Sequence, residues 1–264
     1  MPAARIEKRT DPAVRFLRRV RDGDEPERVF CEGHRLLEEL LKSGWPPQEI
    51  YSTAGHVERV KQLLSRFSRE GAPLRVLSED VMAFVSSVDS APGVIAVAKK
   101  RPARPAPSGG MPLVLVLHGL QLPQNVGAIL RTAEAAGVSE IWTTRGTADP
   151  FGPKALRGSS GSAFRLPIRA AASLTEAASA ISTSGAVIVG ATQNGRLAYD
   201  RLDWTRPIAL VLGSEGGGFS EADAALLTET AKIPMAGSVE SLNVAGAAAV
   251  CLFEAARQRR SAAR

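Results

Sequence analysis

Apolar residues recur with helical and strand spacing over two stretches of the chain, and a linker without either spacing separates them. The linker, residues 99–111 (KKRPARPAPSGGM), is rich in proline, glycine and cations. We therefore divide the chain into a first domain, residues 1–98, and a second domain, residues 112–264, on either side of this linker.

The first domain is predicted to begin with a basic helix, whose apolar stripe contains Val14, Phe16, Leu17 and Val20. Beyond it, short apolar runs alternate with stretches of helical spacing. The predicted strands are residues 28–31, 49–52, 74–77 and 94–98, and the predicted helices are residues 33–43, 57–67 and 79–86. This alternation predicts a small α/β domain.

The second domain shows the same alternation more strongly. Strands are predicted at residues 113–117, 140–143, 186–191, 208–212 and 232–234, and helices at residues 126–136, 174–183, 220–229 and 244–257. Gly137 is expected to end its helix in a left-handed conformation. Ser220 is expected to cap the helix that follows it, with Asp223 as the acid of a capping box. The pattern predicts an α/β fold, a parallel sheet covered by helices.

Three loops that follow strands of the second domain are the candidates for chemistry, because ligands of open α/β sheets bind at the carboxyl ends of strands. In the first loop, Asn125 is expected to cap the helix at residues 126–136, and Arg131 follows about one and a half turns later. Beside a strand end, these two polar groups can together position one phosphate and its ribose. The alternative is that Asn125 is only a cap and Arg131 only a surface cation. In the third loop, Ser241 and Asn243 precede the long helix, and capping also explains either of them taken singly.

The second loop, residues 213–218, has four glycines in six residues, which indicates positive φ angles or close approach to a ligand. It matches neither G-x-G-x-x-G nor a P-loop. Glu215 in its middle favours a neutral or cationic ligand group over a phosphate. A nicotinamide-dependent oxidoreductase is therefore the weaker alternative.

The net charge of +6 and pI of about 9.7 favour polyanionic partners. Residues 5–21 contain seven Lys or Arg against two acids, and a second basic cluster spans residues 145–169. Each cluster can also be an ordinary solvated surface.

The three histidines lack the spacing of metal ligands, so no metal is expected. The two cysteines, Cys31 and Cys251, are expected to be free thiols. Without an apolar run of membrane-spanning length or a signal peptide, the expected location is the cytoplasm.

Taken together and in this order, the three loops resemble motifs one, two and three of the SpoU/TrmH branch of the SPOUT RNA methyltransferases. The matching strings are Asn125-x-Gly127-x-x-x-Arg131, then residues 212–216 (LGSEG), then residues 233–235 (IPM) with residues 241–244 (SLNV). Residues 154–168 resemble the family's second-strand region. The first domain more loosely resembles the family's substrate-binding domain, which is related to RNA-binding ribosomal proteins, through residues 30–37 and 91–97.

The resemblance implies a C-terminal trefoil knot, a homodimer, and S-adenosylmethionine as cofactor for transfer of a methyl group to a ribose 2′-hydroxyl. The dimer interface would be formed by the helix that follows Asn125 and the helix at residues 244–257. The implied catalytic residues are Arg131, Asn125, Glu215, Ser241 and Asn243. The implied cofactor-binding residues are Thr192, Leu212, Gly213, Ser214, Gly216, Ile233, Met235, Ser241 and Leu242.

By the resemblance, Arg131 stands at the position of the residue proposed as the general base in this family, but an arginine keeps its proton at ordinary pH. Holding a phosphate and the developing oxyanion is the other role. Arginines of the basic clusters and the first domain are expected to bind RNA phosphates: Arg9, Arg18, Arg19, Arg35, Arg157 and Arg165. By analogy with the family, the two-domain build favours ribosomal RNA over transfer RNA as substrate. A non-catalytic RNA-binding protein of the same fold is the remaining alternative.

Overall fold

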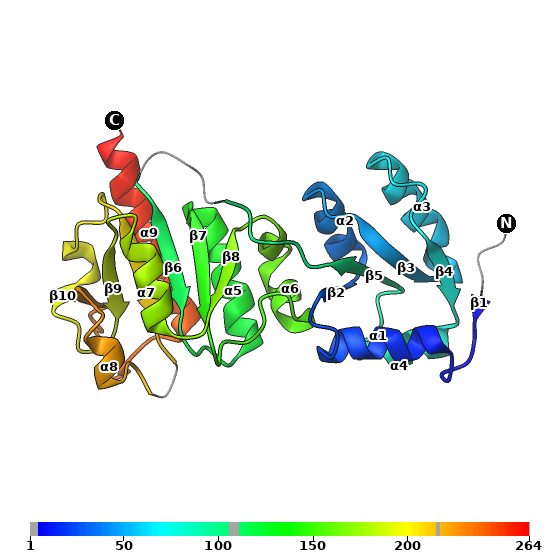
Figure 1. Ribbon diagram of the computed structural model, residues 1–264, viewed down its shortest axis with the longest axis horizontal. Coiled ribbons are helices and arrows are strands. Elements are labelled where there is room, and N and C mark those ends of the chain that lie inside the picture. Colours follow the sequence, from blue (N-terminus) through cyan, green and yellow to red (C-terminus); the bar gives the residue numbers. More distant parts are fainter. Residues whose placement is uncertain (1–4, 106–110, 215–216, 264) are drawn as a thin grey trace. The chain divides into compact units, whose positions relative to one another are not determined.

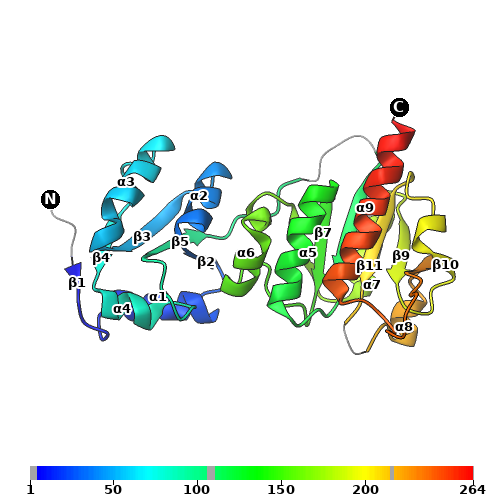
Figure 2. The same ribbon diagram turned by 180° about the vertical axis from the view of Figure 1, so that it is seen from behind.

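The computed structural model describes residues 5–105, 111–214 and 217–263 (Figures 1 and 2). Contacts divide these residues into two compact units, which are described separately below. The first unit contains residues up to Pro102 together with Phe151–Arg165. The second unit contains Ala103–Pro150 and the described residues from Leu166 onward.

The first unit is built on a mixed sheet, which has five strands in the order β1-β4-β3-β5-β2 among the described residues. β4 pairs in parallel with β1 and β3, and β5 pairs antiparallel with β3 and β2. The strands are β1 (Arg5–Ile6), β2 (Arg28–Glu32), β3 (Pro47–Thr53), β4 (Leu74–Leu77) and β5 (Val94–Lys99). The helices are α1 (Pro12–Asp22), α2 (His34–Lys42), α3 (Val57–Arg66), α4 (Glu79–Val85) and α6 (Pro153–Ser159).

Helices cover both faces of this sheet: α1 and α4 lie on one face, and α2 and α3 lie on the other (Figure 1). The predicted stripe of α1 is confirmed, since Val14, Leu17 and Val20 are buried and Phe16 is partly buried. Its ends follow local chemistry: the Asp11 side chain accepts a hydrogen bond from the Ala13 amide at 2.8 Å, and Gly23 closes the helix at φ 92°.

The segment Phe151–Arg165 packs in the first unit although it lies far along the chain from the other residues of that unit. Trp45 is 4 % exposed and packs against Phe151 and Phe164, with ring centroids 5.7 and 5.3 Å away. The Trp45 indole N–H also donates to the Phe164 carbonyl at 3.2 Å. An aromatic cluster therefore joins residues more than a hundred positions apart.

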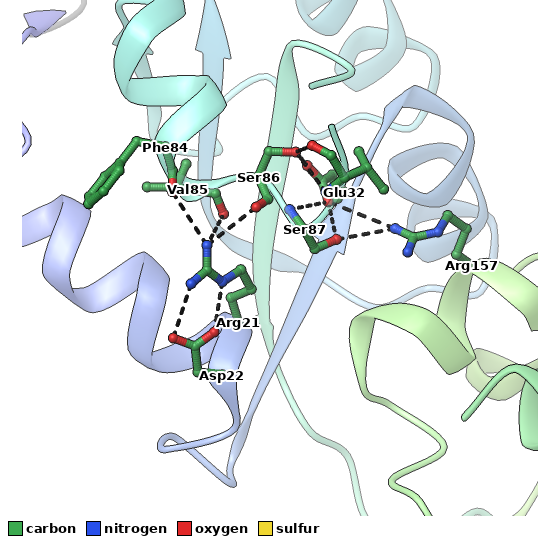
Figure 3. Close-up of polar contacts among 9 residues, drawn as sticks. Arg21, Asp22, Glu32, Phe84, Val85, Ser86, Ser87 and Arg157 are labelled. Carbon is green, nitrogen blue, oxygen red and sulfur yellow. Dashed lines mark hydrogen bonds and ion pairs between the residues drawn. The ribbon is translucent and has the colours of Figure 1, made fainter. Parts of the chain in front are cut away.

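A buried carboxylate adds a polar connection to the same segment (Figure 3). Glu32 accepts hydrogen bonds from the Ser86 hydroxyl at 2.5 Å and the Ser87 amide at 3.0 Å, and also from the Ser87 hydroxyl. From α6, Arg157 donates to the Ser87 hydroxyl at 3.1 Å and lies 4.0 Å from the Glu32 carboxylate. Nearby, Arg21 donates to three carbonyls at the end of α4.

The second unit is built on a parallel sheet, as predicted for this part of the chain. Among the described residues its seven strands have the order β10-β12-β9-β11-β6-β7-β8. They are β6 (Leu113–Leu117), β7 (Glu140–Thr144), β8 (Ile168–Ala171), β9 (Val187–Ala191), β10 (Leu197–Ala198), β11 (Ile208–Leu212) and β12 (Glu229–Lys232). The helices are α5 (Pro123–Ala136), α7 (Leu174–Ser182), α8 (Glu221–Ala224) and α9 (Val244–Ala262).

α5 and α9 lie side by side on one face of the second sheet, and α7 lies on the other (Figure 2). β6 and β11, at the centre, are buried along their whole length, which explains their uninterrupted apolar runs. Gly137 ends α5 at φ 79°, as predicted. Both Cys31 and Cys251 are buried free thiols, as expected, and burial raises the pKa of Cys251 to about 12.

Three predicted helices have clearly different bounds in the structure. The last of them, α9, runs to Ala262 rather than ending at residue 257. α5 begins at Pro123 rather than at residue 126, because proline is favoured in the first turn, so Asn125 is not the N-cap. α8 ends at Ala224, and the predicted helix to residue 229 is wrong there. The Thr228 amide bonds to the Ile188 carbonyl at 2.9 Å, which directs the chain into β12 instead. Ser220 does cap α8, since its hydroxyl accepts from the Asp223 amide at 3.1 Å.

Candidate active site

The carboxyl ends of the central strands meet at one edge of the second unit's sheet, because all of its strands run in parallel. Backbone hydrogen bonds join the loops that leave this edge. The His118 amide donates to the Leu212 carbonyl, and the Thr192 amide donates to the Ala231 carbonyl, both at 2.9 Å. The loops after β6, β9, β11 and β12 are therefore adjacent.

The described ends of the glycine loop after β11 contact each other. Ser214 and Gly218 form an antiparallel bridge, and Gly218 has a φ of +60°. A Cβ on Gly213 would lie 3.0 Å from the Gly218 carbonyl oxygen and 3.2 Å from the Phe219 ring, so a side chain there is crowded by the chain itself. Two residues of the predicted site, Glu215 and Gly216, lie outside the described residues.

His118 connects the first loop to the glycine loop. Its Nδ1 lies 2.9 Å from the Thr144 hydroxyl, and its Nε2 lies 3.3 Å from the Asp223 carboxylate. The ring also stacks on Phe219, with centroids 6.5 Å apart and planes at 16°. A hydrogen bond from Ser220 and the nearby His118 hold the pKa of Asp223 below its ordinary value, against the opposing effect of burial.

Sequence reasoning missed this network, because it weighed His118 only as a metal ligand and Asp223 only as a helix-capping acid. The one available signal was the position of His118 directly after a fully apolar strand. Within the described part of the chain, no group of three or more His, Cys, Asp or Glu is arranged to hold a metal ion.

The first and third motifs are joined by their asparagines, 118 residues apart in sequence. The Asn243 side-chain oxygen accepts from the Ala245 amide at 2.9 Å and so caps α9. Its side-chain amide donates to the Asn125 side-chain oxygen at 3.3 Å. Asn125, in the first turn of α5, is thus an acceptor for the residue that caps the neighbouring helix.

Arg131 lies on α5, about 9 Å of helical rise beyond Asn125. Its side chain is exposed, and it forms no hydrogen bond or ion pair with the other described residues. Ser241 and Leu242 precede α9 and are also exposed. These polar and apolar side chains are available to bind a substrate, a cofactor or a second chain.

The remaining residues expected to bind a cofactor follow the ends of adjacent strands. Leu212 is buried at the end of β11, and Gly213 and Ser214 continue from it, half-buried. Thr192 follows β9, and Ile233 and Met235 follow β12, all three half-buried. The predicted strand at residues 232–234 is displaced, since β12 ends at Lys232 and leaves Ile233 in the loop.

The six arginines expected to bind RNA differ in their partners. Four of them have carboxylates nearby: Arg9 pairs with Asp80, Arg19 with Glu25, Arg157 approaches Glu32, and Arg165 pairs with Glu39. Arg18 lies over the Phe84 ring, 4.8 Å from its centroid. Arg35 is exposed on α2, beside a cavity described below.

Comparisons with known proteins agree on one family. The family model of the SpoU rRNA Methylase family matches residues 112–253, and that of the MRM3-like substrate binding domain matches residues 13–96. An uncharacterized tRNA/rRNA methyltransferase of Synechocystis sp. is 34 % identical over 97 % of this chain and 94 % of its own length.

Two further relatives have more specific names. The 23S rRNA (guanosine-2′-O-)-methyltransferase RlmB of Ralstonia nicotianae is 38 % identical over 57 % of this chain and 60 % of its own length. The crystal structure of the SpoU methyltransferase AviRb from Streptomyces viridochromogenes, in complex with AdoMet, superposes with a TM-score of 0.83 at 27 % identity, covering 95 % of this chain and 99 % of that one. The expected resemblance is confirmed, and this chain belongs to the SpoU rRNA methylase family.

Proposed function

We propose that this protein transfers a methyl group from S-adenosylmethionine to a ribose 2′-hydroxyl of ribosomal RNA. The observation that carries the proposal is the hydrogen-bonded Asn125–Asn243 pair, which joins the start of α5 to the start of α9. The described ends of the glycine loop and the loop after β12 follow β11 and β12, which both pair with β9 in the same parallel sheet. The names of relatives point the same way, because RlmB acts on 23S rRNA at a guanosine 2′-oxygen and AviRb binds AdoMet.

The residues at this edge fit the cofactor. Ile233, Met235 and Leu242 offer apolar surface for adenine, and the backbone around Thr192, Leu212 and Gly213 offers polar groups for its edge and for the methionine part. A Cβ on Gly213 would crowd Gly218 and Phe219, so this backbone has to remain glycine to keep its course. S-adenosylmethionine supplies an already activated methyl group, so the protein's main task is positioning.

We assign Arg131 to binding the RNA substrate rather than the cofactor. Because a guanidinium stays protonated at any ordinary pH, it serves as a donor rather than as a base. Its exposed fork can hold the phosphate beside the target ribose and stabilise the oxyanion that forms as the hydroxyl loses its proton. Asn125, Ser241 and Asn243 would orient this arginine and the ribose, and Glu215 would order the glycine loop.

We also propose a homodimer formed through α5 and α9. Large apolar side chains are exposed along this face: Leu122 before α5 is 51 % exposed, Leu242 before α9 is 40 % exposed, and Phe253 on α9 is 48 % exposed. Exposed apolar surface of this kind commonly marks a protein interface. The dimer would bring each Arg131 towards a second chain.

The trefoil knot and the cytoplasmic location stay predictions. None of the described helices is long and apolar enough to cross a bilayer.

The test is a map of ribose methylation across total RNA, with and without the gene, combined with calorimetric titration of the purified protein with S-adenosylmethionine. We expect cofactor binding and the loss of 2′-O-methylation at one ribosomal RNA position. Loss at a transfer RNA position would instead identify a transfer RNA methyltransferase. No cofactor binding would leave a non-catalytic RNA-binding protein, and methylated bases with unchanged riboses would refute the ribose assignment.

A further inference from the structure

A basic cavity is lined by residues of α2 and α3 in the first unit. These two helices lie on the same face of the sheet (Figure 1). Its volume is about 300 Å³. His34, Arg35 and Glu38 line it from α2, and Arg59, Gln62 and Arg66 line it from α3. We call this cavity the α2–α3 groove. The α3 residues are spaced by three and four, so they share one face of that helix.

The charge of the groove is unbalanced. Its one acid, Glu38, already lies 3.1 Å from Lys42 and 3.6 Å from Arg66. Arg35 and Arg59 are exposed and form no hydrogen bond or ion pair with other residues in the described part of the chain. Two neighbouring guanidinium groups without a counter-charge attract anions, and phosphate fits their fork geometry best.

The inner wall of the groove is held by a histidine pair. His34 Nε2 lies 2.7 Å from His56 Nδ1, and the two rings stack with centroids 5.0 Å apart. Gly93 leaves the room that His56 needs, because a Cβ there would lie 2.4 Å from the imidazole ring. Burial lowers the pKa of His34 to about 4, so the His34 ring is uncharged at neutral pH and the arginines supply positive charge to the groove.

We propose that the α2–α3 groove binds the phosphodiester backbone of the substrate RNA, with Arg35 and Arg59 each contacting a phosphate. The inference rests on the proposed function, because it takes RNA to be the substrate, and it assigns to this groove the first unit's part in holding it. The sequence already led us to expect Arg35 to bind RNA, and the groove adds Arg59. Arg9 and Arg19, which were also expected to bind RNA, already have carboxylate partners.

The experiment measures binding of deproteinised bacterial 23S ribosomal RNA to the full-length chain by filter binding over a salt series. The test variant is R35Q/R59Q. The matched control is R15Q/R69Q, which removes two exposed arginines of the same unit that do not line the groove. Both variants lose the same net charge, so a difference between them reports the groove.

We expect R35Q/R59Q to bind about tenfold to a hundredfold more weakly than the control. The slope of log affinity against log salt should become shallower by about 1.4–1.8, the value for two lost phosphate contacts. Glu38→Gln, which removes the only acid of the groove, should tighten binding. Equal affinities and equal slopes for R35Q/R59Q and R15Q/R69Q would overturn the proposal.

Methyl transfer and S-adenosylmethionine titration, measured on the same proteins, keep the two proposals apart. If the wild-type protein methylates ribose while R35Q/R59Q binds RNA like the control, only the groove assignment fails. If R35Q/R59Q loses RNA binding while the wild-type protein binds no S-adenosylmethionine, the groove stands and the proposed catalysis fails.

Discussion

Asn243 offers the sharpest test of the candidate active site, because its two contacts have different consequences. Its oxygen caps α9 through the Ala245 amide at 2.9 Å, and its amide donates to Asn125 at 3.3 Å. A capping role alone predicts that Asn243→Ala affects stability only. A role in the site predicts that it also lowers methyl transfer.

Asn243→Ala is expected to lower the free energy of unfolding only slightly, and a control variant can reproduce the same loss. Loss of an N-cap costs about 1 kcal/mol, within a range of about 0.5–2 kcal/mol. The exposed hydrogen bond to Asn125 adds about 0.5 kcal/mol. A suitable control is Ser173→Ala, since Ser173 caps α7 through the Glu176 amide at 3.2 Å, next to the outermost strand β8. Each variant should lower the melting temperature by about 2–6 °C.

The assay compares methyl transfer to ribosomal RNA with thermal unfolding for Asn243→Ala, Ser173→Ala and Asn243→Asp. We expect Asn243→Ala to lose at least about tenfold in kcat and Ser173→Ala to change less than about twofold. Asn243→Asp keeps the capping oxygen and should keep wild-type stability, but it lacks the amide donor, so its activity should stay low. Equal activities for the two alanine variants would refute the reasoning and leave Asn243 a cap.

Three further predictions concern the sheet, the reaction and the histidine pair. Gly190→Ala places a Cβ 2.5 Å from Leu227, so denaturant titration should show a loss of about 1–3 kcal/mol, whereas Gly71→Ala, where a Cβ meets nothing within 4 Å, should change little. Arg131→Ala should lower methyl transfer about a hundredfold or more with calorimetric S-adenosylmethionine affinity unchanged; a loss below threefold would contradict its role. The folded-state pKa of His34 is lowered from 6.5 to about 4, so the unfolded chain binds the extra proton and stability falls as pH drops from 6.5 towards 4. Because this histidine is partly exposed, the loss should be about 1 kcal/mol between pH 7 and pH 5, and His34→Gln should reduce it.

The fold could be predicted where burial alone decides the structure. Residues 113–117 and 208–212 have the predicted bounds, because both strands are buried in the middle of a parallel sheet and contain only apolar residues. β8 and β10 were not predicted as strands. β8 lies at the edge of the sheet, and Ile168–Ala171 is only partly buried, so its sequence shows no apolar run. α6 is short and contains a glycine, which hides its helical pattern.

The site could be predicted as a set of motifs but not as a set of contacts. Asn125 and Asn243 were selected because ligands of open α/β sheets bind at the carboxyl ends of strands, and because of the family resemblance. In the structure a hydrogen bond joins the two side chains. The link between His118 and Asp223 could not be predicted, because it depends on β11 lying beside β6 and on the short α8 ending early. Neither fact leaves a local pattern in the sequence.

The segment Phe151–Arg165 shows why chain order alone does not divide this protein into a part that binds RNA and a part that transfers methyl groups. By sequence it lies inside the methylase match at residues 112–253, yet it packs in the first unit, so the chain passes between the units three times. A fragment that ends at residue 102 would expose the indole of Trp45 and remove Arg157 from the carboxylate of Glu32, whose side chain is 3 % exposed. The first unit is therefore complete only when the segment from the methylase sequence is present, and a single cut in the linker cannot separate two intact parts.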